Sequence, residues 1–525
     1  MMDAREAVPE PRYRVAVVGG GMSGIVTARV LTEIGCEVVV FERADDIGGV
    51  WSASRAYPGI ATQDDRRSYA FSDAPMPEGV AAHPAGDDVR THLEAYVRRH
   101  GLEPSLRLAT VVRQATPVND AGWEVESVGS AGPVVERFDW LVAAHGVFSV
   151  PHVPVWPGRE QFEAAGGRVV VPSAVGDGSV LDGSRTVVIG WGKTACDIAV
   201  AASSRSADTR LVARRLTWKY PKRLGFGRLT FHHLVLTRAG ERLLATNYRD
   251  ATGRLLLRRV PERLPRVLLD RILARAVDRA TGFSRSGLRS TFEFRNSTSL
   301  LTDGFIEAVE GGRLAVHREQ SVAELGADED GPFVRLTDGS RLRADVLVPA
   351  TGYEQGVGFL SDDALQRLRE AGGLLLHRRI LAIDLPRLAF IGCSHSYRSP
   401  LTAEVSAVWL ASVLRGRVRL STPARRRAGA VLYPLGPDLA GGAHTAALPP
   451  VTLRQLDGLL SEVGAPLPLR TRIRQIWHPT DPADYAAALQ RALQPDARSR
   501  RSRRVDSGFF ESLDDPANRS TNRIS

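Results

Sequence analysis

The segment Arg14-Val-Ala-Val-Val-Gly-Gly-Gly-Met-Ser-Gly24 decides how this chain begins to fold. Its β-branched run at 14–18 ends on glycine, which predicts a short buried strand of a parallel sheet. Residues 22–34 then carry apolar side chains at helical spacing, and residues 37–41 again have the composition of a strand. Strand, helix and strand in this order predict a βαβ unit with a glycine turn before its helix.

The glycine turn has the spacing G-x-G-x-x-G that is typical of a dinucleotide site. Gly19 permits the tight turn, Gly21 lets backbone N–H groups approach a pyrophosphate, and Gly24 lets the helix pack closely on the strand. Met22 and Ser23 open the helix, so we expect both residues to contact the pyrophosphate as well.

Glu42 follows the second strand, about 20 residues beyond the glycine turn. A carboxylate at this place accepts hydrogen bonds from ribose hydroxyl groups. The alternative is a plain glycine turn with a Glu that faces solvent. We favour the dinucleotide site, because the glycines and the acid occur together with the two strands and the helix that such a site requires.

A second unit of the same kind begins with the β-branched strand 185–189. It continues as Gly190-Trp191-Gly192-Lys193-Thr194-Ala195, with a helix from about Thr194. Ala195 takes the place of the third glycine, which the motif tolerates. We therefore predict a second dinucleotide site.

The strand 209–213 of this second unit ends at Arg214 and Arg215. A site for NAD favours an acid there, whereas a guanidinium pairs with the oxygens of a 2′-phosphate. The two arginines therefore indicate NADPH, and Lys219 could assist them. The alternative is a pair of solvated charges at a strand end.

Further strand-like runs at 344–348 and 388–392 complete an alternation of strands and helices. This pattern predicts an α/β protein with two Rossmann-like dinucleotide-binding domains, of which the first is discontinuous. We place the first domain at 1–155 and 336–494, the latter including a C-terminal helical region. The second domain, with a helical insert, is expected at 156–335, and residues 495–525 are expected to be a disordered tail.

Composition excludes several other classes of protein. The net charge of +10 is scattered along the chain, so nucleic-acid binding is not expected. The three cysteines are far apart, which excludes a disulfide framework and a zinc site, and we predict no metal. The chain lacks the apolar core of a signal peptide and any run of 18 apolar residues, so we expect a cytoplasmic protein without a transmembrane segment. Nothing in the sequence predicts an oligomeric state.

The Arg- and Leu-rich stretch 236–283 has a helical pattern that allows two interpretations. One is a basic amphipathic face that contacts a membrane surface or a partner. The favoured interpretation is a solvated helical insert with a buried stripe of leucines.

The residues after Glu42 carry a resemblance to a known family. Glu42 to Trp51, with its second glycine pair, resembles the E…iGG-x-W segment of class B flavin monooxygenases. Gly190 to Ala199 resembles their NADPH segment, and Tyr57 to Asp73 resembles their YPG…Y-x-F-S-D loop. The runs 141–149 and 345–353 resemble the two linkers between the domains, so the similarity covers about 14–415.

This resemblance implies FAD at the first glycine turn and NADPH at the second. It implies a monooxygenase that takes O₂ and a small organic substrate and reacts through a flavin C4a-(hydro)peroxide. The expected cofactor contacts beyond the two glycine turns and their strand ends are Gly49, Val50, Trp51, Thr62, Gln63, Asp64, Cys196, Asp197, Thr351 and Gly352.

Gln63 aligns with an Asn of the family beside the flavin, so we carry a catalytic role to it; the alternative is an ordinary loop residue. Baeyer–Villiger members have Arg and Asp where this chain has Ala61 and Gln63. Oxygenation of nitrogen or sulfur is therefore favoured. The alternatives are a Baeyer–Villiger reaction on a ketone, or an uncoupled NADPH oxidase or flavin reductase.

The chain departs from the family at the signature F-x-G-x-x-x-H. The corresponding stretch runs from Phe162 to Ser173, and Pro172 stands where the family has His. This difference favours weaker coupling between NADPH use and oxygenation. His145 replaces a linker Thr, and we expect it to be a packing residue.

Overall fold

The computed structural model describes residues 13–119, 121–223, 230–244, 263–290, 299–354, 356–370, 374–394, 397–433 and 451–494. The predicted tail 495–525 and part of the predicted helical insert lie outside these residues.

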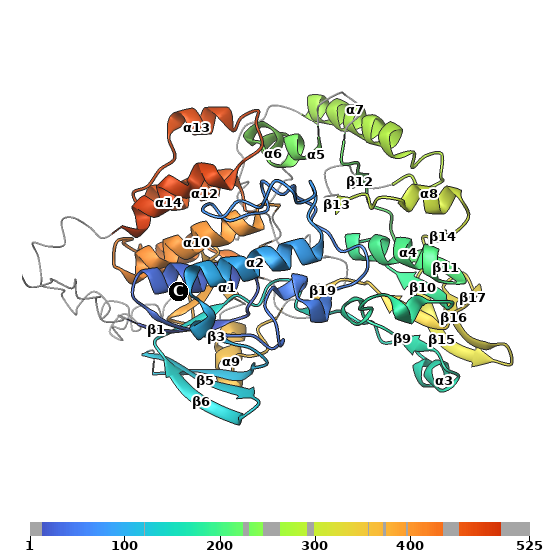
Figure 1. Cartoon of the computed structure of the whole chain (residues 1–525), viewed down its shortest axis with the longest axis horizontal. Helices are drawn as coiled ribbons and strands as arrows, with labels where there is room; N and C mark the ends of the chain where they lie inside the picture. Colours follow the sequence, from blue (N-terminus) through green and yellow to red (C-terminus); the bar gives the residue numbers. More distant parts are fainter. Residues whose placement is uncertain are drawn as a thin grey trace, which may run out of the picture.

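The first sheet has eight strands in the described residues and confirms the predicted βαβ unit. Its order is β23 (Val431–Tyr433), β20 (Leu374–His377), β21 (Leu381–Ala382), β22 (Leu388–Phe390), β7 (Trp140–Ala143), β1 (Arg14–Val18), β2 (Glu37–Phe41) and β3 (Leu106–Arg107). The strands from β22 to β3 run parallel. Helix α1 (Met22–Glu33) packs against α10 (Ser399–Leu414) and α2 (Gly86–His100) over one face of this sheet (Figure 1).

The second sheet is parallel throughout. Its order is β14 (Ala315–Arg318), β11 (Asp208–Ala213), β10 (Arg185–Ile189), β18 (Val346–Pro349) and β9 (Arg168–Val169). Helices α4 (Lys193–Arg205) and α8 (Phe305–Glu310) pack against each other beside it. The α/β class with parallel sheets is thereby confirmed.

The predicted boundary at 335/336 is wrong. Strand β18 pairs with β10 of the second sheet, although we expected the chain to have returned to the first sheet by residue 336. The pairing is secured by Asp345, which accepts the backbone N–H of Arg185 at 2.8 Å and forms an ion pair with its guanidinium. The chain leaves the second sheet only after Pro349.

Each sheet carries an antiparallel meander of three strands that the sequence did not predict. The first is β4 (Val111–Val118), β5 (Gly122–Gly129) and β6 (Gly132–Phe138), and the second is β15 (Val322–Asp328), β16 (Gly331–Leu336) and β17 (Arg341–Arg343). The first meander leads into β7 and the second into β18. The two halves therefore repeat one plan, in which the strand after the meander lies beside the strand that begins the unit.

The two connections between the sheets are paired with each other. Strand β8 (Val150–Pro151) runs antiparallel to β19 (Tyr353–Glu354). His152 N donates to Gly352 O at 2.9 Å, and the Thr351 hydroxyl donates to His152 O. The hydroxyl of Thr351, a predicted cofactor contact, is thus used within this ribbon.

The insert lies between β12 (Lys219–Tyr220) and β13 (Ser299–Leu300), which pair in parallel. Its described helices are α5 (Phe231–Val235), α6 (Arg238–Leu244) and α7 (Arg263–Thr281). In Figure 1, α5 and α6 lie between α7 and the C-terminal helices α12 (Leu453–Glu462), α13 (Leu469–Arg474) and α14 (Ala486–Leu493).

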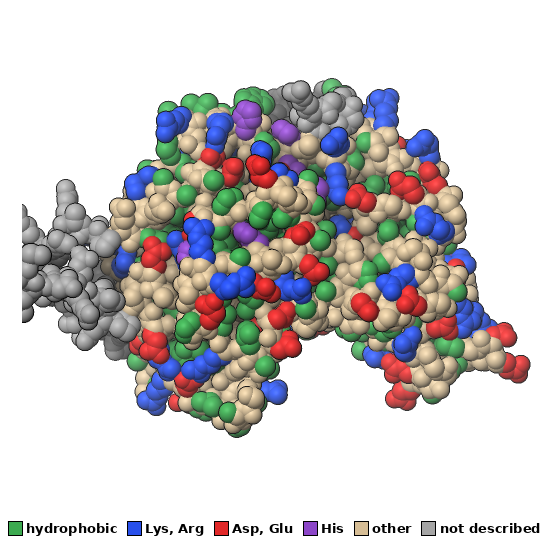
Figure 2. Space-filling model, in the orientation of Figure 1, with side chains coloured by type: hydrophobic (Ala, Val, Ile, Leu, Met, Phe, Trp, Pro, Cys, Tyr) green, Lys and Arg blue, Asp and Glu red, His purple; other side chains and the backbone are tan. Residues whose placement is uncertain are grey.

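Helix α7 buries Val277 but exposes Leu268 and Ile272, so the insert has both a packed face and an apolar exposed one. Membrane contact therefore stays a prediction. Among the described residues no helix is long and apolar enough to span a membrane. Positive and negative side chains are interspersed over the face drawn in Figure 2, as expected from the scattered charge.

The remaining helices of the described residues are short. They are α3 (Arg159–Ala164), α9 (Asp362–Glu370) and α11 (Pro423–Ala428).

A buried carboxyl joins α10 to the loop that follows Phe71. Ser72 donates its backbone N–H to Glu404 Oε2 at 2.9 Å and its hydroxyl to Oε1 at 2.7 Å. Burial raises the pKa of Glu404 from 4.5 to about 7, although the bonds from Ser72 act in the opposite direction. The folded state therefore holds this proton more tightly than the unfolded chain, and the carboxyl lowers stability as the pH rises from the unfolded pKa through about 7.

Glu404→Gln should raise the free energy of unfolding by up to about 3 kcal/mol at about pH 8, because the amide has no charge to desolvate. The gain should shrink towards zero at about pH 5, where the carboxyl is protonated in the folded state. Denaturant unfolding at several pH values measures both effects. Glu94→Gln, at a half-buried position of α2, is the control. A Glu404→Gln stability that tracks the wild type at every pH would contradict the assignment.

Candidate functional site

The two glycine turns are built alike, and both lie against a linker. A methyl group at Gly19 would lie 2.7 Å from Ala144 O, and one at Gly190 would lie 2.3 Å from Ala350 O. Both glycines have positive φ, 112° and 128°. These positions require glycine for the turn itself, whether or not a ligand binds.

The middle glycines have no such requirement. Gly21 and Gly192 have ordinary φ values of −76° and −68°. A methyl group at Gly192 would meet nothing within 4 Å, and at Gly21 its nearest neighbour, Gly49 Cα, would be at a normal 3.5 Å. The protein alone would accept side chains here, so the bare backbone suits the close approach of a ligand.

These two residues are also the N-caps of α1 and α4, and neither helix has a side-chain cap or an acid in its first turn. The first N–H groups of each helix, together with its dipole, therefore suit an anion such as a pyrophosphate. Thr194 in the first turn of α4 bonds to Tyr57 OH at 3.2 Å.

Glu42 lies directly after β2, where the sequence predicted it. It is buried and accepts the N–H of Gly20 at 2.6 Å and the N–H of Ala44 at 2.9 Å. Each carboxylate oxygen keeps a further lone pair for a ribose hydroxyl. Glu42 thus orders the glycine turn as well as being available to a ligand.

The second glycine pair packs on the first turn. Gly48 N donates to Gly20 O at 3.0 Å, and a methyl group at Gly49 would lie 3.1 Å from Gly21 Cα. Val50 is half-buried beside it. Trp51 is 9% exposed and donates its indole N–H to Tyr69 OH at 3.0 Å, so most of its surface is used within the protein.

The C-terminal return of the chain supplies a residue that the sequence did not identify as part of the site. Gly392 has φ 80°, and a methyl group there would lie 2.0 Å from Ser23 Oγ. The segment after β22 therefore touches the start of α1. Its signal in the sequence is a glycine directly after a predicted strand.

The loop 57–65 carries the predicted catalytic position. The side-chain oxygen of Gln63 accepts the backbone N–H of Leu300 at 3.0 Å. Its main-chain oxygen accepts the Nε2–H of His232 at 3.3 Å. His232 belongs to the insert and Leu300 to β13, which follows the insert; both lie far away in the sequence, so no local pattern could reveal them.

Asp64 follows as a buried carboxyl with one oxygen, Oδ1, that has no hydrogen-bond partner in the described part of the chain. Burial and the nearby Asp65 raise its pKa well above the usual range, and the charge of Arg398 opposes that rise. Burial of Asp64 therefore favours its neutral form over its charged form. Thr62 is buried and donates its hydroxyl to Asp64 O at 2.7 Å.

Helix α4 presents Asp197 in a polar cluster. Lys193 Nζ donates to Asp197 Oδ1, and the Thr302 hydroxyl donates to the same oxygen at 2.6 Å. Burial raises the pKa of Asp197, although Lys193 acts against that rise. The side chains of Ala195 and Cys196 lie in the hydrophobic core. The side chain of Cys196 is 1% exposed, and its contact with the cofactor stays a prediction.

Arg214 and Arg215 are exposed immediately beyond β11. Lys219, which the sequence suggested as their helper, is 1% exposed and donates to Ser299 Oγ at 2.7 Å. Its ammonium lies 5.6 Å from the ring centre of Trp191, and burial lowers its pKa. Lys219 is thus a core residue and not a strand-end charge.

A cavity of about 490 Å³ separates the loop 58–62 from α4 and from residues 300–303. Its lining combines the loop 58–62, which lies far before the second glycine turn in the sequence, with residues 300–303, which lie far after it. Its lining includes Gly59, Thr62, His83, Lys193, Asp197 and Thr302. His83 is the member that sequence reasoning missed; burial lowers its pKa to about 4, so it is neutral.

The two departures from the family pattern are packing features. His145 donates Nε2–H to Gly356 O at 3.0 Å and meets the Phe359 ring edge to face, and burial lowers its pKa to about 4. It is the packing residue that the sequence predicted. Pro172 is buried in a short helical turn, Pro172–Ala174, which packs against Ala53–Arg55.

No cluster of ligating side chains that could hold a metal occurs in the described residues. All three cysteines are buried thiols.

Comparison with known proteins finds relatives in sequence and in fold. Human flavin-containing monooxygenase 2 is 25% identical over 480 residues, which cover 86% of this chain and 83% of the relative. The crystal structure of ε-caprolactone-bound cyclohexanone monooxygenase in its Loose conformation has a TM-score of 0.61 at 19% identity and covers 93% of this chain and 98% of its own. A complex of OTEMO with FAD and NADP has a TM-score of 0.60 at 18% identity over 78% of this chain and 86% of its own.

The two structural similarities show a shared fold. Residues 12–427 match the family described as FMO-like, flavin-binding monooxygenase-like, which is most of the chain. The chain therefore belongs to the flavin-binding monooxygenase-like family of oxidoreductases.

Proposed function

We propose that this chain is an FAD-dependent monooxygenase that consumes NADPH and O₂ and oxygenates a nitrogen or sulfur atom of a small organic substrate. The observation that carries the proposal is the pair of bare, uncapped glycine turns, at Gly21 and Gly192, in two units joined by paired linkers. A donor and an acceptor of hydride need two such sites in one protein.

The proposed FAD domain is built on the first sheet and the proposed NADPH domain on the second. The FAD site consists of the first turn with Glu42, the loop 48–51 and residues 62–64. The NADPH site consists of the second turn, Thr194 and the exposed pair Arg214 and Arg215. Thr351 and Gly352 would act through the linker ribbon, because the Thr351 hydroxyl and the Gly352 carbonyl both bond to His152 within it.

Reduced flavin supplies the electrons that activate O₂, so the protein has to orient the reactants and exclude water. Gln63 suits this task because Leu300 N can only donate, which fixes the side-chain oxygen of Gln63 as the bound atom. The amide nitrogen of Gln63 is then the group left to donate hydrogen bonds in the site. Asp64, the next residue of the loop, is a buried carboxyl whose pKa is raised by burial.

The choice of nitrogen or sulfur rests on the uncharged side chains at positions 61 and 63 of this loop. Ala61 and Gln63 stand where a Baeyer–Villiger site has Arg and Asp. Arg66 donates to Val80 O at 3.1 Å, so its guanidinium is engaged by the neighbouring loop. A nucleophilic attack on a ketone would need stabilised negative charge on oxygen, whereas an amine or sulfide needs a neutral donor such as the Gln63 amide.

An uncoupled NADPH oxidase is the second candidate, and Pro172 in place of the family's His supports it. Incubation with ¹⁸O₂, NADPH and a panel of amines, sulfides and ketones separates the candidates by product mass. The proposal predicts N- or S-oxides that carry one ¹⁸O atom. Labelled esters or lactones as the sole products would favour the Baeyer–Villiger reaction, and NADPH consumption without any labelled product would favour the oxidase.

Gly192→Ala tests the second site without disturbing the fold. Because no protein atom lies within 4 Å of the added methyl group, the variant should melt like the wild type. Its dissociation constant for NADPH should rise about ten- to a hundredfold, since the methyl group blocks a charge-assisted backbone contact. Calorimetric titration with NADPH measures the change. Gly190→Ala is the contrasting variant and should lower the melting temperature, because it strains a positive φ. Unchanged NADPH affinity in Gly192→Ala would place the nucleotide elsewhere.

Arg214→Ala with Arg215→Ala tests the cofactor choice. Removing the guanidinium groups should reduce the preference for NADPH over NADH by about ten- to a hundredfold, because each charge-assisted phosphate contact contributes about 1.5–3 kcal/mol. Flavin reduction rates at low cofactor concentration give the preference. Arg210→Ala on the same strand, whose guanidinium pairs with Asp208, should leave it unchanged. A double variant that still prefers NADPH as strongly as the wild type would refute the role of these arginines.

A further inference from the structure

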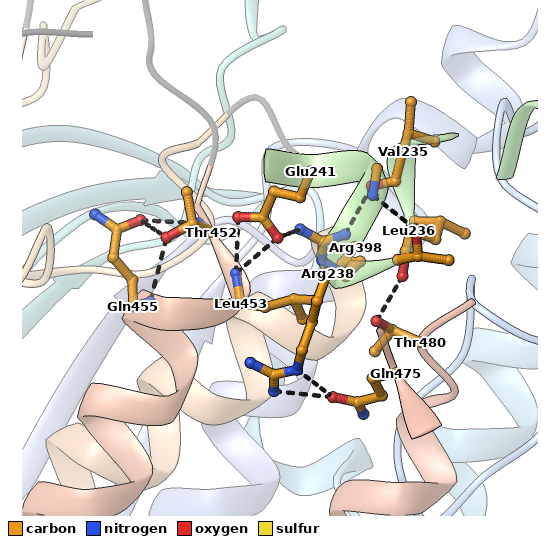
Figure 3. Close-up of polar contacts among 12 residues, drawn as sticks. Val235, Leu236, Arg238, Glu241, Arg398, Thr452, Leu453, Gln455, Gln475 and Thr480 are labelled. Atoms are coloured by element: carbon orange, nitrogen blue, oxygen red, sulfur yellow. Dashed lines mark hydrogen bonds and ion pairs between the residues drawn. The ribbon is translucent and has the colours of Figure 1, made fainter. Parts of the chain in front are cut away.

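A set of buried polar contacts ties the insert to the C-terminal segment. We call it the insert clasp, and its members are Arg238, Glu241, Arg398, Leu453, Asp457 and Gln475. Arg238 pairs with both oxygens of Asp457 at 2.6 and 2.9 Å, and it also donates to Gln475 Oε1 at 2.9 Å. Figure 3 shows the Gln475 side of this contact, with Arg238 reaching from α6 towards the C-terminal helices.

The second half of the clasp is centred on Glu241. Its carboxylate accepts the backbone N–H of Leu453 at 3.0 Å and the guanidinium of Arg398 at 3.1 Å. Arg398 also donates to Val235 O at 2.9 Å, at the end of α5. The view in Figure 3 places these groups around the corner between α5 and α6. The clasp therefore holds this corner from two sides.

Burial makes the geometry of the clasp specific. The side chain of Arg398 is 6% exposed, and those of Arg238 and Asp457 are 17% and 14% exposed. Charges removed from water to this extent are stable only when their hydrogen-bond partners are in place. A displaced insert would leave these charges without partners, so the clasp favours one position of the insert.

The part of the insert that the clasp holds also contacts the loop 57–65, which carries the candidate catalytic residue. Helix α5 carries His232, which donates to Gln63 O, and β13 carries Leu300, whose N–H binds Gln63 Oε1. Phe231 and Leu300 belong to one buried apolar cluster, so α5 and β13 are packed together. Helix α5 therefore carries one hydrogen-bond partner of Gln63 and shares a buried cluster with the strand that carries the other.

We propose that Arg238 and Glu241 are positioning residues, which hold Gln63 in one amide orientation through α5 and β13. This inference rests on the proposed role of Gln63. Neither residue needs to touch a substrate or a cofactor. They act by keeping Leu300 N at the side-chain oxygen of Gln63, so that the amide nitrogen remains the donor.

Arg472 provides a matched control within the same cluster. Its Nε lies 3.5 Å from Asp457 Oδ2, so it contacts the same carboxylate as Arg238. Arg472 belongs to α13 in the C-terminal segment and is half exposed, so its contact does not reach the insert. Arg238→Gln and Arg472→Gln remove the same charge next to the same partner, and only the first variant breaks a bond across the clasp.

Hydrogen–deuterium exchange on the FAD-loaded protein tests the positioning directly. In Arg238→Gln, the peptide that contains Leu300 should exchange at least about tenfold faster, because its N–H loses the bond to Gln63 more often. Arg472→Gln should exchange like the wild type. Glu241→Gln, which keeps an acceptor for Leu453 N but loses its charge opposite Arg398, should change exchange in the same direction and serves if Arg238→Gln does not fold. The proposal would be overturned if the folded Arg238→Gln and Glu241→Gln variants exchanged at the wild-type rate. It would also be overturned if Arg472→Gln accelerated the exchange of this peptide as much as they do.

Coupling to Gln63 distinguishes positioning from general stability. With methyl phenyl sulfide, Arg238→Gln should lower the sulfoxide formed per NADPH consumed by the same factor as Gln63→Ala, and the combined variant should lower it no further. Anaerobic flavin reduction by NADPH should stay within about twofold of the wild type, because the clasp does not touch the second glycine turn. Additive losses in the combined variant would overturn the proposal. Exchange requires no turnover, so it decides the positioning even if the ¹⁸O₂ experiment rejects the proposed function.

Discussion

The architecture depends on one steric constraint, the contact of each glycine turn with the carbonyl group that begins a linker. Gly19 lies against Ala144 O and Gly190 against Ala350 O, so closely that no side chain fits at either glycine. The same carbonyl-bearing residues are bonded to the neighbouring strands, because Ala144 N donates to Val18 O and Ala350 N donates to Ile189 O, both at 2.9 Å. Each turn is therefore set by the strand after the meander. The two linkers leave from the same place in each unit and can pair as β8 and β19.

This repetition explains why much of the fold could be predicted from local sequence. The strands at 14–18 and 37–41 and the strand at 185–189 were predicted with the observed bounds, because short β-branched runs beside a glycine turn leave few alternatives. The boundary between the sheets was misplaced, because 346–349 reads as a buried strand in either sheet. Its partner, β10, is decided by Arg185 and Asp345, which are distant in sequence.

The candidate site also has one part that could be predicted from local sequence and one part that could not. The bare glycines Gly21 and Gly192 and the acid Glu42 could be predicted, because ligand chemistry demands these residue types at that spacing. The partners of Gln63 could not, since His232 and Leu300 reach the loop only through the tertiary packing of the insert. Burial also changes the interpretation of residues whose chemical type alone suggests a functional role. Lys219 becomes a core ammonium over Trp191, and Asp64 becomes a carboxyl with a raised pKa.

The central claim is that the two glycine turns bind a hydride donor and a hydride acceptor that meet in one protein. Anaerobic stopped-flow reduction of the FAD-loaded enzyme, with NADPH deuterated at either face of nicotinamide C4, tests this claim most directly. The account predicts that NADPH bleaches the flavin absorbance and that deuterium on one face, but not on the other, slows the bleaching. Flavin that stays oxidised in excess NADPH, or equal rates with both deuterated cofactors and the unlabelled one, would contradict it.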